Sequence, residues 1–447
     1  MKFVGVLAMS AVVMGPVVAQ ASGLALRENS GAGQGSAFAG ASAAAEDISY
    51  MYHNPAGITR HRGEHFVVTA TAIMPKAEFT STSATTVLTG TIGGGNGGSD
   101  VGPDSIAPAI FYSKQLSDRM FLGASLTVPF GLAIEYEPGW VGRYHALKSK
   151  IMTYNFNPVI AYKATDKLSI AGGLQISYTH AFLSNAVDFG TYDALPVASG
   201  GLGGAYSGTP TEDDGVAEVE GDDYTYGFNL GLLYEFSPMT RVGAAYRSML
   251  HNNLEGPANF YNGPLGDTIS GATGVFVKTE VQATVNLPEV ASFGVYHEVS
   301  DRLALMGEVA WTGWSRLQEL RVQFANAQPD SVIVSKWRDT WFFAVGAHYK
   351  LDGGWLLRGG VAYDQSPVPD ATRTPRVPDE DRKWISIGAR YQFSPDSYFD
   401  FGYTRLVFDD ASLQLSTAEP SNGLRGNLSG KYKISTDILA LQYRLAF

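Results

Sequence analysis

The sequence contains no cysteine and, beyond its first residues, no long apolar run. The absence of cysteine excludes a disulfide scaffold, a thiolate metal site and a cysteine nucleophile. A transmembrane helix needs about 18 or more consecutive apolar residues. No stretch after the amino-terminal segment reaches that length, so the sequence excludes a helical transporter of the inner membrane.

Basic residues are also scarce, since 32 Lys and Arg stand against 43 Asp and Glu, for a formal net charge of -11. Binding to nucleic-acid phosphates needs basic surface, so we expect no nucleic-acid partner. The sequence is rich instead in glycine, tyrosine and phenylalanine, with 51, 23 and 23 copies. This composition suits a membrane β-barrel, which has small residues in its lumen and aromatic girdles at both membrane interfaces.

The amino terminus has the pattern of a secretory signal peptide. Lys2 is followed by an almost entirely apolar or small stretch from Phe3 to Val18, and Ala19-Gln20-Ala21 then forms an A-x-A cleavage signal. We therefore predict a signal peptide over residues 1–21 and an exported mature chain. The alternative is a retained anchor helix.

Apolar and polar residues alternate over long stretches downstream of about residue 62. In one such run Tyr154, Phe156 and Ile160 alternate with Asn155 and Asn157. A period of two over ten or more residues indicates strands with one apolar face, long enough to cross a bilayer at a tilt. Counting these runs predicts about fourteen strands, placed near 62–80, 105–116, 119–135, 148–164, 167–184, 222–236, 240–255, 285–299, 302–320, 337–351, 354–365, 381–394, 398–411 and 431–447.

The connections between these strands alternate in length. Tight polar turns such as Ser117-Asp118-Arg119 alternate with long segments such as Ser81 to Pro103, Asn185 to Gly221 and Gln365 to Asp381. Short periplasmic turns and long outer loops are the barrel arrangement. We therefore predict an all-β protein whose residues 62–447 form an antiparallel transmembrane β-barrel of about fourteen strands.

The carboxyl-terminal strand ends in Phe447, which shares one face with Leu445 and Tyr443. An aromatic final residue on such a strand resembles the signal read by the outer-membrane assembly machinery. We therefore expect the protein in the outer membrane of a Gram-negative bacterium. There, its expected partners are the assembly machinery, outer-membrane lipid and lipopolysaccharide.

Residues 22–61 do not alternate and are rich in small residues, with Asn54-Pro55-Ala56-Gly57 near their end. We interpret them as a compact hatch, or plug, in the barrel lumen. Apolar residues such as Tyr50, Met51 and Ile58 favour burial over the alternative, a flexible periplasmic tail.

Several patches of the mature chain resemble the FadL family of long-chain fatty acid transporters. The segment Leu24 to Arg60, LALRENSGAGQGSAFAGASAAAEDISYMYHNPAGITR, is similar to the hatch of that family, including its Asn-Pro-Ala element. Further similar patches, in family order, are Pro129-Phe130-Gly131-Leu132, Gly142-Arg143-Tyr144, Trp311-Thr312-Gly313-Trp314-Ser315, Tyr363-Asp364-Gln365-Ser366-Pro367-Val368-Pro369 and Pro378-Asp379-Glu380-Asp381-Arg382. The resemblance implies a fourteen-stranded barrel that is plugged by an N-terminal hatch.

The third predicted strand contains a proline and a glycine in positions unfavourable for a ladder. Pro129 removes a hydrogen-bond donor, and Gly131 weakens packing two residues later. We predict a kink or bulge over Pro129, Phe130 and Gly131 that opens a gap in the wall. The family resemblance implies a lateral opening there, controlled by the hatch and its Asn54, Pro55 and Ala56. The alternative is that Pro129 only ends the strand.

If the apolar residues of each strand face lipid, the other phase faces the lumen. This inward set contains both aromatic and charged residues, namely Tyr296, Glu298, Glu308, Phe342, Arg358, Arg390 and Arg444. The three arginines would pair with the two glutamates or with Glu46 and Asp47 of the hatch. One interpretation is an ion-pair lattice that seats the hatch. The other is a ligand site, with Tyr296, Phe342, Arg358, Arg390 and Arg444 as candidates and an arginine meeting a ligand carboxylate.

Other motifs give no catalytic or metal site. The eight histidines are scattered, without H-E-x-x-H or a pair at ligand spacing, and no local motif supports a Ser–His triad. The acidic run around Glu212-Asp213-Asp214 lacks EF-hand spacing, so we interpret it as a solvated loop rather than a calcium site. We expect no enzyme, no cofactor and no metal.

The leading functional hypothesis is transport of hydrophobic compounds, with long-chain fatty acids first. The ligand would be captured at the outer loops, held in an apolar lumen pocket and released sideways through the kink in the third strand. Uptake of aromatic or aliphatic hydrocarbons is the alternative within transport. A structural or surface-recognition barrel, such as an adhesin or a phage receptor, is the alternative from another class.

Overall fold

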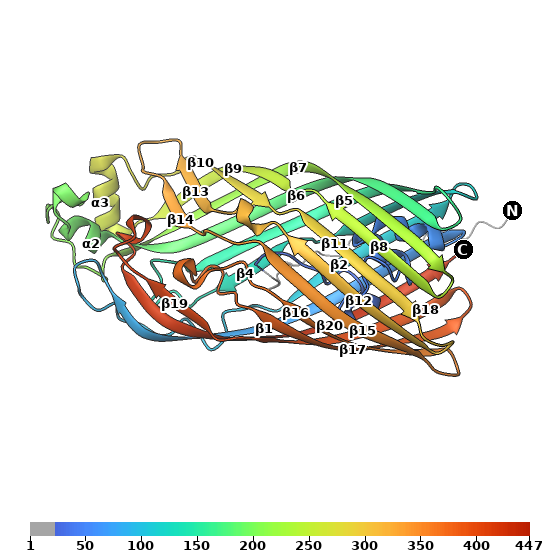
Figure 1. The fold of residues 1–447 in the computed structure, drawn as a ribbon. Coiled ribbons are helices and arrows are strands. Elements are labelled where there is room, and N and C mark those ends of the chain that lie inside the picture. The colour runs from blue at the N-terminus through green and yellow to red at the C-terminus, as the bar shows by residue number, and fades with distance from the viewer. Residues whose placement is uncertain (1–22) are drawn as a thin grey trace.

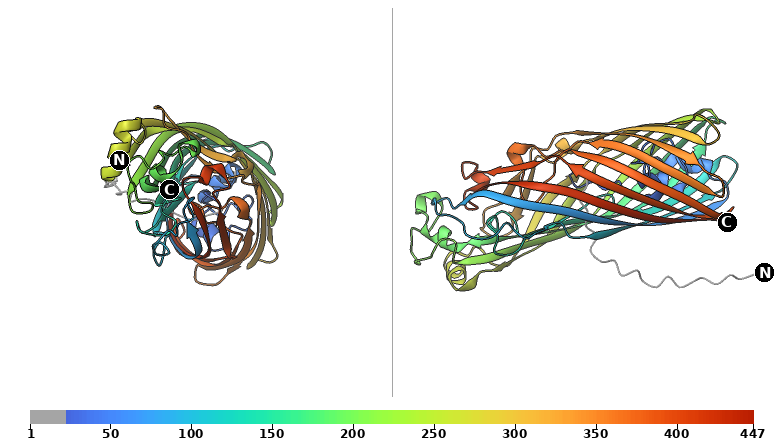
Figure 2. Two further views of the ribbon diagram at one scale, coloured as in Figure 1. Left: turned by 90° about the vertical axis from the view of Figure 1, so that its left-hand side faces the viewer. Right: turned by 90° about the horizontal axis from the view of Figure 1, so that it is seen from below.

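The computed structural model describes residues 23–447, and they form an antiparallel β-barrel whose first strand pairs with its last (Figures 1 and 2). The predicted signal peptide lies outside the described residues. The strand segments are β1 (Glu64–Thr85), β2 (Ser105–Gln115), β3 (Met120–Thr127), β4 (Gly131–Glu135), β5 (Lys148–Lys163), β6 (Leu168–Asp188), β7 (Asp214–Ser237), β8 (Thr240–Arg247), β9 (Leu250–Tyr261), β10 (Thr279–Leu287), β11 (Val290–Glu298), β12 (Leu303–Thr312), β13 (Glu319–Phe324), β14 (Ser331–Val334), β15 (Thr340–Lys350), β16 (Trp355–Asp364), β17 (Arg382–Ser394), β18 (Ser397–Phe408), β19 (Ala411–Leu415) and β20 (Asn427–Ala446).

These segments make up fourteen barrel strands, because six of the strands are each interrupted once. The interrupted strands are β3 with β4, β8 with β9, β10 with β11, β12 with β13, β14 with β15, and β18 with β19. The predicted fourteen-stranded antiparallel barrel is therefore confirmed. The strands also extend further into the outer loops than predicted, since β6 continues to Asp188 and β7 already begins at Asp214.

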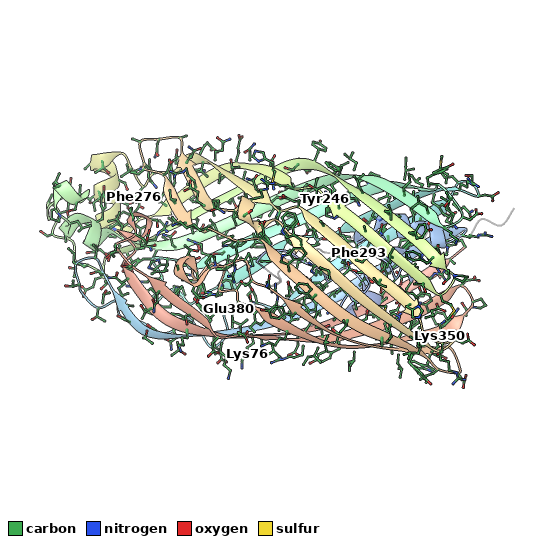
Figure 3. All side chains as sticks on the ribbon, in the orientation of Figure 1. Lys76, Tyr246, Phe276, Phe293, Lys350 and Glu380 are labelled. Carbon is green, nitrogen blue, oxygen red and sulfur yellow. The ribbon has the colours of Figure 1, made fainter. Side chains whose placement is uncertain are left out.

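Alternation along each strand sorts the side chains between the lumen and the outer surface. On β20, Ala440 and Gln442 are buried, whereas Leu439 and Leu441 are half exposed on the outer face. Figure 3 shows side chains such as Phe293 and Tyr246 on the outer surface of the wall. This apolar outer surface is what a lipid-embedded barrel requires.

The helices are short and lie in the N-terminal segment or in the loops. They are α1 (Gly31–Gln34), η1 (Ile48–Tyr52), η2 (Pro55–Arg60), α2 (Phe189–Ala194), η3 (Val197–Ser199), α3 (Gly263–Thr273), η4 (Trp314–Arg316), η5 (Asp370–Thr372) and η6 (Pro420–Asn422). Among residues 23–447, no helix is both long and apolar enough to span a membrane.

Residues 23–61, which we call the N-terminal segment, lie inside the barrel rather than beside it (Figure 2). Met51 and Ile58 are fully buried against Phe111 and Phe121 of the wall. On another side, the ring of Phe38 meets Trp384 edge-on at 6.3 Å between centroids. The segment therefore supplies the apolar core that fills this part of the lumen.

Candidate functional site

Glycines in the wall allow the N-terminal segment to lie directly against the strands. A Cβ atom built on Gly243 of β8 would overlap the carbonyl oxygen of Ser42, and one built on Gly360 of β16 would overlap that of Ser36. Only glycine permits this close approach between two backbones. The sequence of the barrel is thus shaped around the segment that it encloses.

Asn54, Pro55 and Ala56 lie at the start of η2, where Asn54 connects the segment to the wall. The Asn54 side-chain oxygen accepts a hydrogen bond from the amide of Ala56 at 3.0 Å. Its Nδ2 atom donates to the carbonyl oxygen of Ser42 at 2.6 Å and to that of Leu232 on β7 at 2.9 Å. One side chain thus caps the helix, closes the turn before it and holds both to the barrel.

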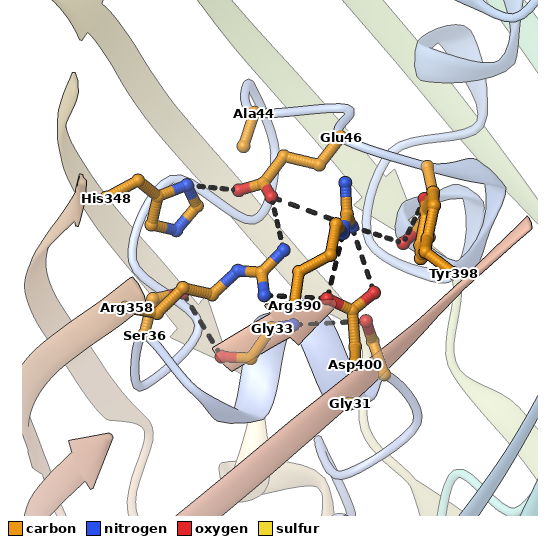
Figure 4. A network of polar contacts seen from close by, with 12 residues as sticks. Gly31, Gly33, Ser36, Ala44, Glu46, His348, Arg358, Arg390, Tyr398 and Asp400 are labelled. Carbon is orange, nitrogen blue, oxygen red and sulfur yellow. Dashed lines mark hydrogen bonds and ion pairs between the residues drawn. The ribbon is translucent and has the colours of Figure 1, made fainter. Parts of the chain in front are cut away.

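A buried cluster of ion pairs joins the N-terminal segment to the opposite wall (Figure 4). Arg358 of β16 contacts Asp400 of β18 at 2.6 Å and Glu46 of the segment at 2.9 Å. Arg390 of β17 binds both carboxylate oxygens of Asp400 at 2.9 Å and contacts Asp47 of the segment at 3.3 Å. The side chains of Arg358 and Asp400 are fully buried, so neither charge is solvated by water.

The charges of this cluster change the pKa values of two acids in the N-terminal segment, Glu46 and Asp47. Burial raises the pKa of Glu46, but the nearby His348, Arg358 and Arg390 outweigh it and hold that pKa at about 2. Burial and the neighbouring Asp400 raise the pKa of Asp47 above its usual value, although Arg390 opposes the shift. Glu46 is therefore the charged anchor of the segment at neutral pH.

The other inward residues named from the sequence are distributed elsewhere. Arg444 donates from Nη2 to Nδ1 of His65 at 2.7 Å, outside the cluster. The guanidinium of Arg241 lies 3.6 Å from the ring centroid of Tyr296. The guanidinium of Arg27 lies 4.1 Å from the ring centroid of Phe342. The residues paired with Arg358 and Arg390 are Glu46, Asp47 and Asp400. Of the two wall glutamates considered as partners, Glu308 is instead held by Ser42, and Glu298 accepts from Tyr296 at 3.2 Å.

The third barrel strand is interrupted between β3 and β4, at the position predicted from Pro129 and Gly131. Both β3 and β4 pair with β5, but only β3 also pairs with β2. At the break, the amide of Phe130 donates to Oγ1 of Thr153 instead of to a backbone carbonyl, at 2.9 Å. The edge of β4 that faces β2 therefore has no wall strand beside it.

The N-terminal segment occupies part of this free edge. The amide of Leu26 donates to the carbonyl oxygen of Pro129 at 2.8 Å, and the amide of Gly131 donates to that of Leu24 at 2.9 Å. Ala25 and Phe130 thereby form an isolated antiparallel bridge. We call this contact between Leu24–Leu26 and Pro129–Gly131 the seal.

An apolar cavity of about 120 Å³ lies in the lumen at the Leu24 end of the seal. Its apolar lining comes from the N-terminal segment, from several strands and their interruptions, and from the connection between β16 and β17. It includes Leu24, Leu132, Ile151, Leu254, Val285, Leu317, Trp337 and Val368. Such a lining suits the alkyl part of a ligand.

The connection between β16 and β17, predicted as an outer loop over Gln365 to Asp381, folds inward and covers this cavity. Tyr136 donates to the carbonyl oxygen of Pro375 at 2.8 Å, and the amide of Gly23 donates to Asp379 at 2.8 Å. The loop is thus tied both to the wall and to the start of the N-terminal segment.

Arg376, in this loop, brings a buried cation to the cavity, and no carboxylate among residues 23–447 pairs with it. Its hydrogen bonds go to neutral oxygens, the Lys148 carbonyl at 3.2 Å, Ser149 Oγ at 3.0 Å and Asn185 Oδ1 at 3.1 Å, while its Nε has no partner. Burial and the like charge of Arg425 lower the pKa of Arg376 to about 9, so the side chain stays charged at neutral pH. A buried cation without an anion is costly, and a bound carboxylate would compensate it.

Lys150 and Glu220 also line the cavity, but they belong to the outward phase of their strands, as Phe156 and Tyr224 do. Arg376 is therefore the lining residue whose charge is directed to the lumen. Sequence reasoning missed it because it lies in a loop, where alternation gives no direction. Asp400 was also missed, although the sequence contains a signal for it. It lies between the outward-facing Phe399 and Phe401, so alternation places it on the lumen side.

Within residues 23–447, no group of three or more His, Asp or Glu side chains is arranged to hold a metal ion. The cavity instead combines an apolar lining with the buried positive charge of Arg376.

Comparisons with known proteins agree with this architecture. A model of the family described as outer membrane protein transport protein (OMPP1/FadL/TodX) matches residues 12–447. A long-chain fatty acid transport protein of Escherichia coli O6:H1 is 30% identical over 391 residues, which cover 86% of each chain.

Two solved structures extend the comparison. A FadL homologue from Pseudomonas aeruginosa superimposes with a TM-score of 0.87 at 28% identity, over 95% of this chain and 100% of its own. The toluene transporter TbuX of Ralstonia pickettii shares the fold, with a TM-score of 0.65 at 20% identity over 93% of this chain and 97% of its own.

Proposed function

The chain belongs to the OMPP1/FadL/TodX family of outer membrane transport proteins, and on that premise we propose that it carries long-chain fatty acids through the outer membrane. It is a transporter and not an enzyme. The ligand is captured between the outer loops and held in the apolar cavity. It then leaves sideways into the lipid through the break in the third strand.

The observation that carries this proposal is Arg376 beside the apolar cavity. An alkyl chain gains roughly 0.8 kcal/mol for each methylene that leaves water, so the apolar lining accounts for the tail. A desolvated carboxylate needs a cation or several donors. Arg376 meets that need, because in the part of the chain that the structure describes its hydrogen bonds go to neutral oxygens and to no carboxylate.

The seal supports a gating role for the N-terminal segment as a hatch. Its backbone hydrogen bonds complete an edge of β4 that no wall strand covers. Moving Leu24–Leu26 away would expose this edge and connect the lumen with the lipid beside the wall. Asn54 would set the resting position of the hatch through its hydrogen bonds to Ser42 and Leu232, with Pro55 and Ala56 lying against Gly231 of β7.

Two alternatives differ in what they require of the lumen. A transporter of neutral hydrocarbons needs the apolar cavity but no cation in it. A structural or surface-recognition barrel needs neither the cavity nor a break in the wall. The buried Arg376 favours an acidic ligand over the first alternative, and the cavity and the break together disfavour the second.

The test is equilibrium binding of oleate and of toluene to the protein in lipid nanodiscs, for the wild type and for Arg376→Gln. We expect the Kd of oleate to rise about tenfold to a hundredfold, because a charge-assisted hydrogen bond contributes about 1.5–3 kcal/mol. The Kd of toluene should change less than about twofold, since a neutral ligand makes no such bond. Arg302→Gln, in an exposed turn, is the matched control.

Arg358→Ala, Arg390→Ala and Arg444→Ala extend the same test to the arginines named from the sequence. Equal affinity for oleate in the wild type and in Arg376→Gln, with a loss in one of these three, would move the head-group site to that arginine. Indifference to all four changes would defeat a carboxylate ligand. For the gate, Pro129→Ala should reduce oleate uptake in cells while the barrel still assembles, and unchanged uptake would remove lateral release.

A further inference from the structure

A second, smaller cavity of about 50 Å³ lies at the other end of the seal. Leu24 and Leu132 line the apolar cavity, whereas Leu26, Pro129 and Phe130 line the second one. The two cavities are therefore separated by the short antiparallel contact that closes the free edge of β4. A space of this size exceeds that of one water molecule but cannot hold a long alkyl chain.

The lining of the second cavity includes positively charged side chains beside apolar ones, although the cavity is small. Arg27, which directly follows the seal in the chain, lies with its guanidinium 4.1 Å above the ring centroid of Phe342. Within residues 23–447, its side chain has no hydrogen-bond or ion-pair partner. A guanidinium carries five donors, so Arg27 presents an unused set of donors to this space.

Arg247 of β8 supplies a second cation to the same lining. It donates to Gln175 Oε1 at 2.6 Å and to the Tyr52 carbonyl oxygen at 2.8 Å, and both acceptors are neutral. His53 also lines the cavity, and its Nε2 is buried without a partner. Three nitrogen-bearing side chains thus line one cavity, and among residues 23–447 no carboxylate forms a hydrogen bond with any of them.

Glu308 is the carboxylate among the lining residues, and it is already committed elsewhere. Its oxygens accept hydrogen bonds from the amide of Ser42, at 3.0 Å, and from the Ser42 hydroxyl. These hydrogen bonds hold the N-terminal segment. The charge of Arg27 acts on Glu308 at a distance, but among residues 23–447 no hydrogen bond or ion pair joins Glu308 to Arg27 or Arg247. The two arginines therefore remain uncompensated by hydrogen-bonded anions.

We propose that Arg27 and Arg247 form a second carboxylate-binding site, which receives the head group of the ligand after it leaves Arg376. This inference rests on the proposed function and adds a residue-level step to it. A fatty acid that moves past the seal must take its carboxylate away from Arg376 while its tail is still in the barrel. A free carboxylate in this water-poor space would be strongly destabilised. Arg27 and Arg247 provide the next hydrogen-bonding position at the break, so the charge is never left without a partner.

The site predicts a rate effect that depends on the charge of the ligand. In Arg27→Gln and Arg247→Gln, the rate of oleate uptake by cells should fall about tenfold, since a charge-assisted hydrogen bond is lost along the route. Uptake of methyl oleate and of toluene, which carry no carboxylate, should be unchanged in the same variants. Arg27→Lys should restore part of the oleate rate, because it keeps the charge but loses the planar donor fork.

Equilibrium binding separates this site from the apolar cavity. Arg27→Gln should leave the Kd of oleate in nanodiscs within about twofold of the wild type, whereas Arg376→Gln raises it. Arg62→Gln, which changes an exposed arginine directly after the N-terminal segment, is the matched control. Resistance of the folded barrel to unheated detergent verifies that each variant is assembled.

Each outcome decides one of the two proposals. Equal losses for oleate and methyl oleate in Arg27→Gln would mean a structural role and would overturn the second site, as would no loss for either ligand. If Arg376→Gln leaves oleate binding intact while Arg27→Gln still discriminates between oleate and its ester, the site at Arg376 fails and the second site stands.

Discussion

The lumen of this barrel buries arginines in two regions, and the regions differ in what surrounds the guanidinium. Around the N-terminal segment, Arg358 and Arg390 are bound by Asp400, Glu46 and Asp47. Around the cavities, Arg376, Arg247 and Arg27 have no carboxylate within hydrogen-bonding distance among the residues that the structure describes.

The difference teaches how the two roles of a buried charge can be separated. A paired arginine has spent its donors on the protein and holds structure in place. An unpaired arginine leaves the protein with an unfavourable charge that a ligand can neutralise. The inward phase of a strand shows from sequence that an arginine faces the lumen. Whether that arginine is paired or unpaired depends on which side chains surround it in the structure.

The largest effect should come from removing Asp400, the carboxylate that Arg358 and Arg390 share. In Asp400→Asn, Arg358 and Arg390 lose their common carboxylate, and a broken buried ion pair costs about 3–5 kcal/mol. We expect the N-terminal segment to become accessible to added protease while the barrel remains folded. Asp396→Asn, in an exposed turn, is the control. A segment that stays as protected as in the wild type would contradict the anchoring role of this cluster.

A methyl group on the wall should displace the segment without changing any charge. In Gly243→Ala the new Cβ overlaps the carbonyl oxygen of Ser42, and overpacking of this kind costs about 1–3 kcal/mol. We expect faster proteolysis of the segment and altered uptake of oleate. Gly307→Ala is the matched control, because its Cβ meets nothing closer than 3.8 Å. Equal behaviour of the two variants would show that close approach at Gly243 is unimportant.

Changing Asn54 tests whether an uncharged contact also holds the N-terminal segment to the wall, in comparison with the buried ion pairs. Asn54→Ala loses both donors to Ser42 and Leu232, and each unsatisfied buried group costs about 1–3 kcal/mol. Asn54→Asp keeps the acceptor for the Ala56 amide but loses the same donors. We expect both variants to take up oleate more slowly, as measured in cells with an assembled barrel. Rescue by Asn54→Asp would assign the effect to the helix cap instead.

The smallest effect should come from pH, and it should have opposite signs for two acids of the same segment. The pKa of Glu46 is held at about 2, below its ordinary value of 4.5. Glu46 therefore stabilises the folded segment above pH 4.5, and this stabilisation is lost as the pH falls from 4.5 towards 2. Burial raises the pKa of Glu28 to about 7, so Glu28 destabilises the folded segment progressively as the pH rises from 4.5 to 7.

Protease protection of the segment, measured against pH, checks both signs. Glu46→Gln should weaken protection at neutral pH and remove its decline in acid. Glu28→Gln should remove the decline towards neutral pH, because the amide cannot ionise. An unchanged pH profile in Glu28→Gln would mean that this carboxyl is already neutralised by another group.

The wall was largely predictable from the sequence because each strand repeats one simple contrast. Residues such as Leu439 and Leu441 face lipid, and their neighbours face the lumen, so the period of two reveals both the strand and its orientation. The outer ends of β6 and β7 were missed because both faces there contact water or loops, and the contrast between them disappears. The break at Pro129 was predictable for a different reason, since proline cannot donate to a ladder.

The ligand region was much less predictable. The direction of Arg376 depends on the inward fold of its loop, which is fixed by contacts with Tyr136, Ser149 and Asn185 from distant parts of the chain. The isolation of Arg27 likewise depends on which residues surround it in space. Sequence patterns indicate where a charge belongs on a strand, but they do not indicate whether an opposite charge lies beside it.

The short pairing of Leu24–Leu26 with Pro129–Gly131 makes the length of the chain as important as its composition. Backbone groups make these hydrogen bonds, so many side chains at residue 25 would satisfy them. Inserting one residue between the pairing and α1, in contrast, would turn every side chain of the short strand to its other side. Leu24 would then leave the apolar cavity, so the spacing between the first residues and α1 is itself under constraint.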